Sequence, residues 1–458
     1  MRTDWLANAD PGTFWANHAW TGFAVLPQKE FAVVVLPIHG FADHGTGLPL
    51  DQEELLGSDL LRRAVERVSG HFTVRVLPPL RFTLAAANVG CFGVDPDTAH
   101  ALLREISESV RAAGFQKLVF FNTSAVNEPL VATAALDVRV AFGLRTYVIS
   151  ARSLGLDLAR PASAKEAKRV ARLAALLGEI RQHLAPPISR KMNDGKRKMR
   201  GASVFPAYRD FYLPAFSRAQ IDAIPSKERA LVVLPMSAIE QHGPHLPTGV
   251  DAFLSQALLA SALPQAGKRA SVYVAPPIIY GKSNEHLGFP GTVTLSAQTL
   301  RQIVLAAAAQ LRAWGFRRIG LFNTHGGNST VLAYTARELC EAHGLEAVVF
   351  RHGFTPRISE QETQWGFHAG EFETALMLAC SPELVRMEKA VCEYPVRAGD
   401  PGELRPVRSP AIFAWRASDI STHGVTGDAT RATFAKGRRW FASAAASLAR
   451  RIIELCRA

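Results

Sequence analysis

The chain carries one pattern twice, and this repetition constrains its fold more than any other feature of the sequence. The run Ala32-Val-Val-Val-Leu-Pro37 matches Ala230-Leu-Val-Val-Leu-Pro235 at a spacing of 198 positions. The same spacing aligns further pairs: Leu48-Pro49 with Leu246-Pro247, Pro78-Pro79 with Pro276-Pro277, and Gly90 and Gly93 with Gly288 and Gly291. At a spacing of 201, Phe121-Asn-Thr123 matches Phe322-Asn-Thr324. Such a series of matches predicts two similarly folded units in tandem.

Each unit alternates short apolar runs with helix-like segments. In the second unit the apolar runs fall near residues 231–235, 272–276, 318–322 and 347–350, and the helix-like segments cover 252–263, 297–314 and 331–343. This alternation is typical of a mostly parallel sheet with helices on both faces. We therefore expect an α/β protein made of tandem αβα domains, with one domain over residues 1–185, a basic linker over 186–207 and a second domain over 208–458.

The composition is that of an ordinary globular protein. Of the 458 residues, 48% are hydrophobic and 20% are charged, which allows two or three cores. The start, MRTDWLANADPG, lacks the pattern of a signal peptide, and no run approaches the roughly 18 apolar residues of a membrane helix. The five cysteines are scattered without CxxC spacing, so neither a disulfide framework nor a cysteine zinc site is expected. We expect a soluble, cytoplasmic protein with no membrane partner.

The formal net charge of +12 would permit binding to nucleic acid or to an anionic surface. The densest basic run, residues 190–200, lies in a segment punctuated by proline and glycine and contains no aromatic side chains that could stack on bases. A solvated linker is therefore expected there, and nucleic acid is not expected as a partner.

The strand-like run at residues 231–235 ends in a loop rich in metal-binding side chains. Glu240, His242, His245 and Asp251 lie there within twelve positions. In open α/β sheets, sites form just beyond the carboxyl ends of strands. Imidazole and carboxylate groups bind zinc, manganese or iron, and the Asp251 carboxylate is able to bridge two ions. The loop therefore predicts a two-metal site. The alternative is that Glu240 and His242 are solvated and His245 packs in the core.

Two later clusters supply further ligands. Asn323-Thr-His325-Gly-Gly-Asn328 follows the run at 318–322, and His368-Ala-Gly-Glu371-Phe-Glu373 opens a helix-like apolar segment. Because parallel strands end at a common sheet edge, His286 and His325 are expected beside the first loop. Other residues are expected to shape the site: Asn284, Glu285 and His286 as pocket residues, and Gly326 and Gly327 as positions where the backbone passes close to an ion or substrate.

Five motifs of the second unit resemble those of the creatininase family of creatinine amidohydrolases and relatives, in the same order and at similar spacing: EQHGPHLPTGVD, NEHLGFPGT, NTHGGNS, HAGEFETALML and STHGVTGDATRATFAKG. The resemblance runs from Tyr208 to the C-terminus. It implies a compact αβα domain with a binuclear metal site that hydrolyses C–N bonds of cyclic or linear amides. It also implies two divalent ions, zinc or manganese with iron as a further option, and a ring-like homo-oligomer.

Matched position by position, the resemblance implies four metal ligands: Glu240, His242, Asp251 and His325. Glu373 is our choice for the remaining carboxylate, with Glu371 as the other option. In the creatininase itself a carboxylate lies two residues after the histidine of the third motif, and here that position is Gly327. This departure leaves open whether creatinine is the substrate and which residue is the fifth ligand.

The first unit lacks most of these side chains at the aligned positions. The replacements are Ala42 for Glu240, Glu53 for Asp251 and Ser124 for His325, and only His44 matches its counterpart, His242. One histidine and one carboxylate cannot hold two ions that each need about four ligands. We expect an inactive domain kept for packing, assembly or covering the site of the second unit, or a degenerate copy with no role beyond stability.

The ligand set predicts amide hydrolysis. Two ions sharing Asp251 would lower the pKa of a bridging water, polarise a carbonyl oxygen and stabilise the tetrahedral oxyanion. His368 or Glu371 is expected to protonate the leaving nitrogen, unless His368 only orients a ligand and Glu371 only caps its helix. We expect a metal-dependent amidohydrolase acting on a small cyclic amide or formamide. The alternatives are a metallopeptidase acting on a peptide-derived metabolite and a non-catalytic metal-binding scaffold.

Overall fold

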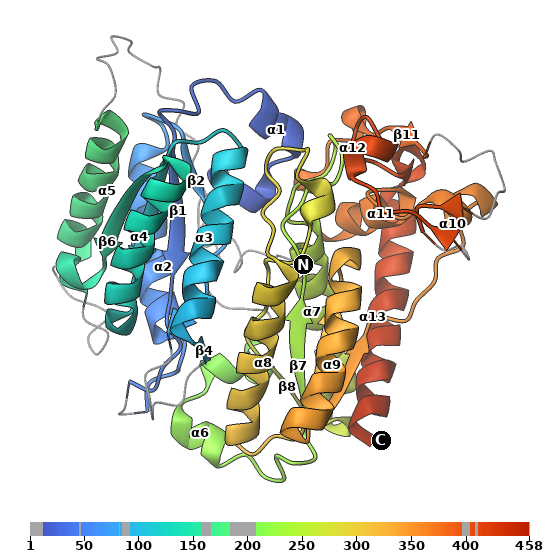
Figure 1. Cartoon of the computed structure of the whole chain (residues 1–458). Coiled ribbons are helices and arrows are strands. Elements are labelled where there is room, and N and C mark those ends of the chain that lie inside the picture. Colours follow the sequence, from blue (N-terminus) through green and yellow to red (C-terminus); the bar gives the residue numbers. More distant parts are fainter. Residues whose placement is uncertain are drawn as a thin grey trace.

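Two four-stranded sheets lie at the centre of the molecule, one in each half of the chain (Figure 1). The computed structural model describes residues 12–44, 47–81, 83–84, 92–156, 166–183, 208–395, 404–407 and 411–457. The first sheet has the order β2-β1-β5-β6 and is formed by β1 (Val33–Ile38), β2 (Val74–Val76), β5 (Lys117–Asn122) and β6 (Arg145–Ser150). The second has the order β8-β7-β9-β10 and is formed by β7 (Leu231–Met236), β8 (Val272–Val274), β9 (Arg318–Asn323) and β10 (Glu346–Phe350).

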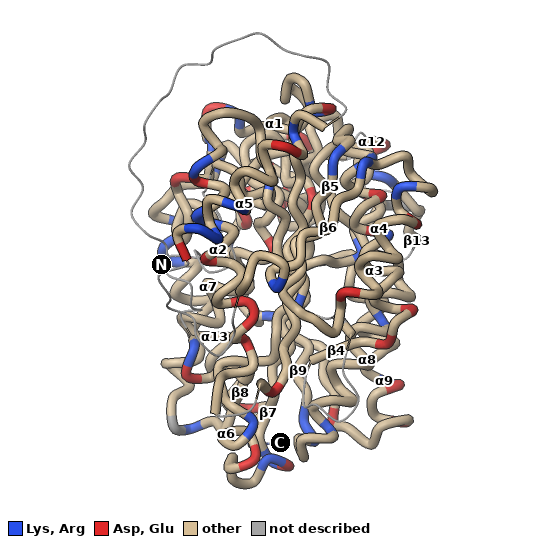
Figure 2. Tube along the Cα trace, turned by 90° about the vertical axis from the view of Figure 1, so that its left-hand side faces the viewer, with Lys and Arg blue, Asp and Glu red and all other residues tan. Residues whose placement is uncertain are grey.

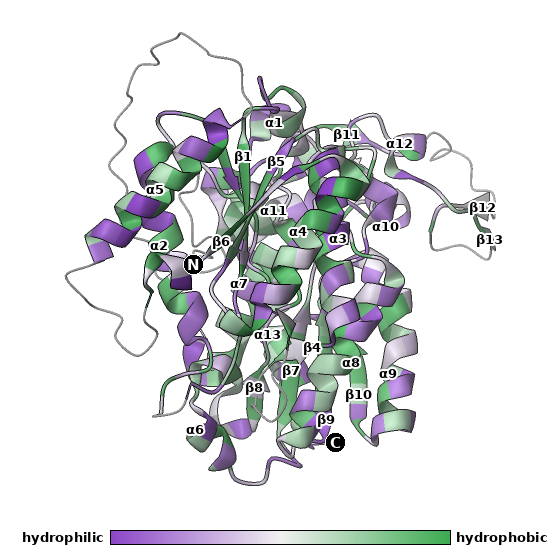
Figure 3. Ribbon diagram, turned by 60° about the vertical axis from the view of Figure 1, so that its left-hand side comes forward, coloured by the Kyte–Doolittle hydropathy of each residue, from purple (hydrophilic) through white to green (hydrophobic). Residues whose placement is uncertain are grey.

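All strand pairs within these two sheets are parallel, as the sequence predicts. Strands β1 and β7 are buried along their whole length. Their runs of valine and leucine fit a central position that is covered on both faces, because β-branched and aliphatic side chains pack well on a pleated surface. Figure 3 shows these strands in the apolar interior between layers of helices.

The helices repeat with the same spacing as the strands. The equivalent pairs are α2 (Gln52–Val68) with α7 (Val250–Ala266), α3 (Pro96–Ala112) with α8 (Ala297–Ala313), and α4 (Glu128–Phe142) with α9 (Ser329–His343). Helix α5 (Glu166–Gln182) packs on α2, as α13 (Phe434–Arg457) packs on α7. We call residues 14–183 the N-terminal repeat and residues 208–457 the C-terminal repeat. The expected tandem αβα architecture is confirmed, and the expected linker at 186–207 lies outside the described residues.

The C-terminal repeat has a long segment, residues 351–433, where the N-terminal repeat has only residues 151–165 between β6 and α5. This segment contains α10 (Glu360–Trp365), α11 (Glu371–Cys380) and α12 (Ala417–Ile420), with the short strands β11 (Cys392–Glu393), β12 (Leu404–Arg405), β13 (Ala411–Ile412) and β14 (Gly427–Asp428). Helix α11 packs against both α7 and α13. The HAGEFET motif therefore reaches the C-terminal sheet through an element with no described counterpart in the N-terminal repeat.

The two repeats contact each other through equivalent surfaces. The amides of Thr248 and Gly249 donate to the carbonyls of His18 and Ala16 at 3.0 and 2.9 Å, and those of Leu50 and Asp51 donate to Phe216 and Pro214 at 3.3 and 2.9 Å. Each residue of one set lies 198 positions from its counterpart in the other. Helices α3 and α8, which are equivalent, also pack together. A patch that meets its own counterpart is the arrangement of a two-fold dimer, here within one chain.

The short elements near this boundary also repeat. Helix α1 (Trp20–Ala24) corresponds to α6 (Arg218–Asp222), and β3 (Thr83–Leu84) pairs with β4 (Gly93–Val94) in the N-terminal repeat.

No helix in the described part of the chain is long and apolar enough to cross a membrane. Basic and acidic residues are interspersed over the face that Figure 2 presents. The basic run at 190–200 is among the residues that are not described.

Candidate metal centre

Five predicted ligands meet at the carboxyl edge of the C-terminal sheet. Two of them follow β7, one lies in the first turn of α7, one follows β9, and one lies in the first turn of α11: Glu240, His242, Asp251, His325 and Glu373. We call these five residues the ligand cluster. All are buried except the half-buried Glu373. The parallel topology explains this meeting, because β7 and β9 are neighbours that end at the same edge.

Asp251 lies between the two histidines of the cluster. Its Oδ2 is 3.3 Å from His325 Nδ1, and its Oδ1 is 3.8 Å from His242 Nε2. Glu240 Oε1 is 3.2 Å from the same His325 nitrogen and 3.9 Å from His242 Nε2. One carboxylate that offers a separate oxygen to each side is the geometry needed to bridge two ions.

The hydrogen bonds of the two histidines hold the ring nitrogens that point away from the cluster, so in the neutral form of each ring the nitrogen that faces the cluster carries the lone pair. His242 Nδ1 lies 3.1 Å from the backbone carbonyl of Glu240, and His325 Nε2 lies 2.9 Å from that of Lys282. Each carbonyl accepts the ring N–H, so the opposite nitrogen presents its lone pair to the carboxylates. Histidines that bind metal almost always donate their other N–H in this way.

Several polar atoms of the cluster are buried without a hydrogen-bond partner: Glu240 Oε2, His242 Nε2 and Asp251 Oδ2. Buried polar atoms are normally satisfied, and lone pairs that face one another repel unless a proton or cation lies between them. Ligand atoms of Glu240, His242 and Asp251 lie within 4.8 Å of one another, as do those of His242, His368 and Glu373. The donor set and its spacing therefore fit divalent metal ions.

The pKa shifts of the ligand cluster also indicate a site for bound cations. Burial raises the pKa of Asp251 to about 6 and, together with repulsion from Asp251, raises the pKa of Glu373 to about 8. Burial alone would lower the pKa of His325, but Glu240 and Asp251 raise it well above its usual value. Three carboxylates held this close together are stable only with bound protons or cations.

His368 lies at the edge of the cluster, stacked between two other imidazoles. Its ring centroid is 4.3 Å from that of His286 and 4.5 Å from that of His242. Its Nε2 donates to the carbonyl of Gln241 at 2.8 Å, which leaves Nδ1 facing Glu240 Oε1 at 3.7 Å. Burial lowers the pKa of His368. The ring is therefore neutral and presents a lone pair to the cluster.

The backbone after His368 is held in an uncommon conformation. Ala369 has a φ of +54°, and its amide donates to Glu373 Oε2 at 2.6 Å. Left-handed backbone at a non-glycine residue is sparsely populated and is often found at functional sites. This turn places His368 and Glu373 on the same side of the start of α11.

Glu371 points away from the ligand cluster. Its carboxylate pairs with Lys436 of α13, and its amide donates to Glu362 Oε1 at 2.9 Å. It belongs to none of the groups of described residues that could hold a metal ion. The structure therefore places Glu371 in a half-buried ion pair that ties α11 to α13, and not beside a reacting group.

The expected pocket residues divide into two groups. His286 Nε2 lies 3.6 Å from Glu240 Oε2, and Glu285 has a carboxylate oxygen within reach of Glu240 and His325. Asn284 is exposed, and its side-chain oxygen accepts from Lys282 Nζ, so it lies outside the cluster. Gly326 has open space at its Cβ position, whereas Gly327 is closely surrounded. Of the three pocket side chains, His286 and Glu285 border the ligands.

Gln241 connects the site, although no pattern in the sequence marks it as a site residue. Its side-chain nitrogen donates to His286 Nδ1 and to the carbonyl of Gly424, each at 2.9 Å, and its backbone carbonyl accepts from His368. A Cβ at Gly424 would lie 2.0 Å from Gln241 Oε1, so only glycine fits there. The sequence feature that could have identified Gln241 is its position between the predicted ligands Glu240 and His242 in the EQHG motif.

The N-terminal repeat holds only remnants of this arrangement. His44 Nε2 is 3.6 Å from Glu53 Oε1, and Glu53 Oε2 accepts from the amide of Gly40 at 2.8 Å. Burial raises the pKa of Glu53 to about 7. Among the described residues, every group that could hold a metal lies in the C-terminal repeat.

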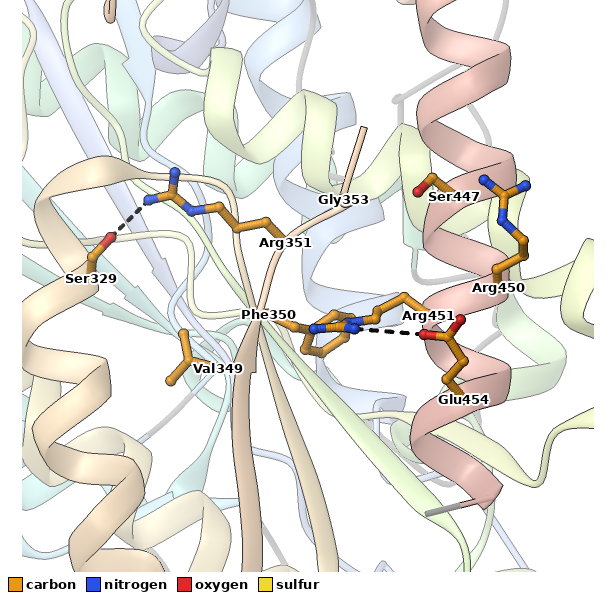
Figure 4. A pocket seen from close by; sticks show the side chains of 9 residues that line it. All are labelled: Ser329, Val349, Phe350, Arg351, Gly353, Ser447, Arg450, Arg451 and Glu454. Carbon is orange, nitrogen blue, oxygen red and sulfur yellow. Dashed lines mark hydrogen bonds and ion pairs between the residues drawn. The ribbon is translucent and has the colours of Figure 1, made fainter. Parts of the chain in front are cut away.

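A separate pocket lies between the end of β10 and α13 (Figure 4). Arg351, which lines it, donates to Ser329 Oγ at 2.8 Å, and Arg451 pairs with Glu454 at 3.6 Å. None of the lining residues belongs to the ligand cluster. We assign this pocket no part in the chemistry.

The chain is similar to known proteins over about half of its length. A mycofactocin precursor peptide peptidase from Mycolicibacterium smegmatis is 35% identical over 226 residues, which cover 48% of this chain and 84% of that protein. A creatinine amidohydrolase from Pseudomonas putida is 33% identical over 204 residues, 40% of this chain and 76% of that protein. The solved structure of a manganese creatininase has a TM-score of 0.44 and 26% identity, and covers 53% of this chain and 98% of its own. The family model described as creatinine amidohydrolase matches residues 16–183 and 215–452, and with both repeats matched the chain belongs to the creatininase family.

Proposed function

We propose that the C-terminal repeat is a metal-dependent hydrolase that cleaves an amide C–N bond of a peptide or peptide-derived molecule. The ligand cluster carries the proposal, because Asp251 offers one oxygen to each of two histidines that turn a ring nitrogen toward it. The peptide class now takes precedence over a small cyclic amide or formamide. The reason is the 35% identity to mycofactocin precursor peptide peptidase, which extends over 84% of that protein.

The residues divide into two sets that would hold the two ions. We assign Glu240, Asp251 and His325 to the first ion from the contacts of His325 with both carboxylates. We assign His242, Asp251 and Glu373 to the second, because His242 lies 3.8 Å from Asp251 and its ligand atom lies within 4.8 Å of that of Glu373. We propose zinc or manganese as the bound metal, with iron as a further option, because imidazole and carboxylate donors suit all three. When bound, such ions supply an activated water and polarise the carbonyl of the scissile bond.

The remaining chemistry falls to His368. Its neutral ring faces the cluster with Nδ1. That nitrogen would accept the proton of the attacking water and then return it to the leaving nitrogen. The carbonyl of Gln241 holds the opposite N–H, so the tautomer that has a basic Nδ1 is the one maintained.

A small cyclic amide is the second candidate substrate. It is favoured by the 33% identity to a creatinine amidohydrolase. The glycine at position 327 weighs against creatinine itself, because the creatininase motif places a carboxylate there. The two classes differ in their products, since a peptide yields two chains and a cyclic amide yields one ring-opened molecule.

The proposal is tested with the purified full chain, first stripped by a chelator and then supplied with zinc or manganese. A library of short peptides is followed by mass spectrometry, and creatinine, other lactams and formamides are followed by amine or formate release. Metal-dependent peptide cleavage that disappears in His325→Ala is the expected result. Cleavage of lactams alone would establish the second candidate. If the protein binds two ions but turns over neither peptides nor small amides, the result would favour a non-catalytic metal-binding scaffold.

We further propose that the N-terminal repeat, which lacks the ligands, supports the loop that carries them. The carbonyls of Ala16 and His18 accept from Gly249 and Thr248, two and three residues before Asp251. The carbonyl of Thr248 in turn accepts from the amide of Glu240. Glu240 is thus connected through Thr248 to the N-terminal repeat by hydrogen bonds, and Asp251 lies two residues after Gly249, which is bonded to that repeat.

A further inference from the structure

A carboxylate from a second loop lies next to the first set of ligands. Glu285, on the short helix over Asn284–His286, has a carboxylate oxygen within 4.8 Å of a Glu240 oxygen and of a His325 ring nitrogen. Its position matters because Glu240, Asp251 and His325 provide three ligands, whereas a divalent ion needs about four or more.

Gly327 provides the space in which the Glu285 carboxylate lies. A Cβ built at Gly327 would lie 2.5 Å from Glu285 Oε1, 2.5 Å from His325 Nε2 and 2.3 Å from the carbonyl of Lys282. Real Cβ atoms do not approach other atoms this closely, so any larger residue would displace the Lys282 carbonyl, the Glu285 carboxylate or the His325 ring. Gly326, next to it, has nothing within 4 Å of its Cβ position. The crowding is therefore specific to position 327, which lies against Glu285, His325 and the backbone of Lys282.

The distances allow coordination after a small movement. Ligand atoms around one tetrahedral ion, with bonds of about 2.1 Å, lie roughly 3.4 Å apart. Glu285 is half-buried and has several rotatable bonds, so a closure of about 1 Å needs only a change of side-chain torsion angles. The other members of the first set are fixed: His325 by its bond to Lys282, and Asp251 by its place at the start of α7.

We propose that Glu285 is the fourth protein ligand of the ion held by Glu240, Asp251 and His325, and that Gly327 is required to make room for it. This inference rests on the proposed function, because it needs a metal at the ligand cluster. It assigns the loop of Glu285 and His286 to the metal centre itself. In this view Gly327 does not weaken the site, because it admits a carboxylate from elsewhere in the fold.

The test compares metal binding by the full chain and three variants: Glu285→Gln, Gly327→Ala and the matched control Asn284→Ala. Zinc and manganese affinity is measured by titration calorimetry, stoichiometry by elemental analysis, and coordination by the visible absorption of the cobalt(II)-loaded protein. Glu285→Gln and Gly327→Ala are expected to weaken one of the two ions at least tenfold and to change the cobalt spectrum. Asn284→Ala is expected to behave as the parent.

The outcomes separate this inference from the function on which it rests. A parent chain that binds no divalent ion would overturn the proposed function. A parent that binds two ions, with Glu285→Gln binding both at unchanged affinity and with an unchanged cobalt spectrum, would overturn only the role of Glu285. Circular dichroism of the metal-free proteins checks the fold. If Glu285→Gln does not fold, Glu285→Asp takes its place, and an unchanged affinity and spectrum there would also overturn the assignment.

Discussion

Oδ2 of Asp251 lies 3.3 Å from Nδ1 of His325, although the only proton on that ring in its neutral form is directed to the carbonyl of Lys282. A carboxylate and a nitrogen lone pair at this distance repel unless a positive charge joins them. In the metal-free protein a second proton on His325 provides this positive charge, which is why the pKa of His325 is raised well above the usual value. A divalent ion would take the place of that proton, and metal binding is then linked to proton release.

Asp251→Asn is expected to remove both ions, because the side chain belongs to both sets of ligands and an amide is a poor substitute for an anionic oxygen. The metal-free variant should nevertheless unfold at a higher temperature than the metal-free parent, since a buried acid near Glu240 is lost. Elemental analysis and thermal unfolding measure the two effects. A variant that retains both ions would contradict the bridging role.

Glu371→Gln and Glu373→Gln should fail in different ways. Glu371→Gln breaks the pair with Lys436 and is expected to lower the free energy of unfolding by roughly 1–3 kcal/mol with normal metal content. Glu373→Gln is expected to lose one ion and all turnover. Denaturant unfolding and elemental analysis on the same samples separate the two. Metal loss in Glu371→Gln alone would invert the assignment.

The contrast between these two glutamates shows how far the sequence leads. Residues two positions apart on a helix are separated by a rotation of about 200° around the helix axis and therefore point in nearly opposite directions. Only one of them can face the site. The sequence does not say which, because the deciding partner, Lys436, lies 65 positions away. Gln241 was missed for the same reason, since its partners His286, His368 and Gly424 come from distant segments. Strands, helices and repeat register were predictable because they depend on local apolar patterns and turns.

His368→Ala should keep both ions and lower the turnover rate by roughly 10²–10⁴-fold, the usual worth of a positioned proton-transfer group. The physical reason is that Nδ1 faces Glu240 while the opposite nitrogen is held by Gln241. Rate measurements are paired with elemental analysis of the same protein. A substrate whose leaving group needs no proton should lose less. If an ion is lost as well, His368 is a ligand and not a proton carrier.

Glu53 gives the N-terminal repeat a distinct dependence of stability on pH. Burial raises its pKa to about 7 in the folded protein from 4.5, so folding favours the protonated form. The folded state then binds more protons than the unfolded state between these values, and stability falls as the pH rises from 4.5 to 7. Glu53→Gln should remove this fall, which amounts to roughly 3 kcal/mol. Denaturant unfolding at pH 5 and pH 8 tests it, and an equal effect of the substitution at both values would contradict the burial of a protonated acid.

The repeat symmetry offers a matched pair of variants that tests the support of the ligand loop by the N-terminal repeat. Ala16 and Pro214 occupy equivalent positions, and their carbonyls accept from Gly249 and Asp51 respectively. A Cβ at Gly249 would already lie 2.9 Å from Ala16 Cβ, so Ala16→Leu must displace the loop that leads to Asp251. Overpacking of this kind costs about 1–3 kcal/mol. Ala16→Leu should therefore weaken metal binding as well as stability.

Pro214→Leu disturbs the equivalent loop of the repeat without ligands, so it should lower stability and leave metal affinity unchanged. Titration calorimetry of both variants decides the matter, because equal metal affinity in the two would show that the N-terminal repeat does not position the ligand loop.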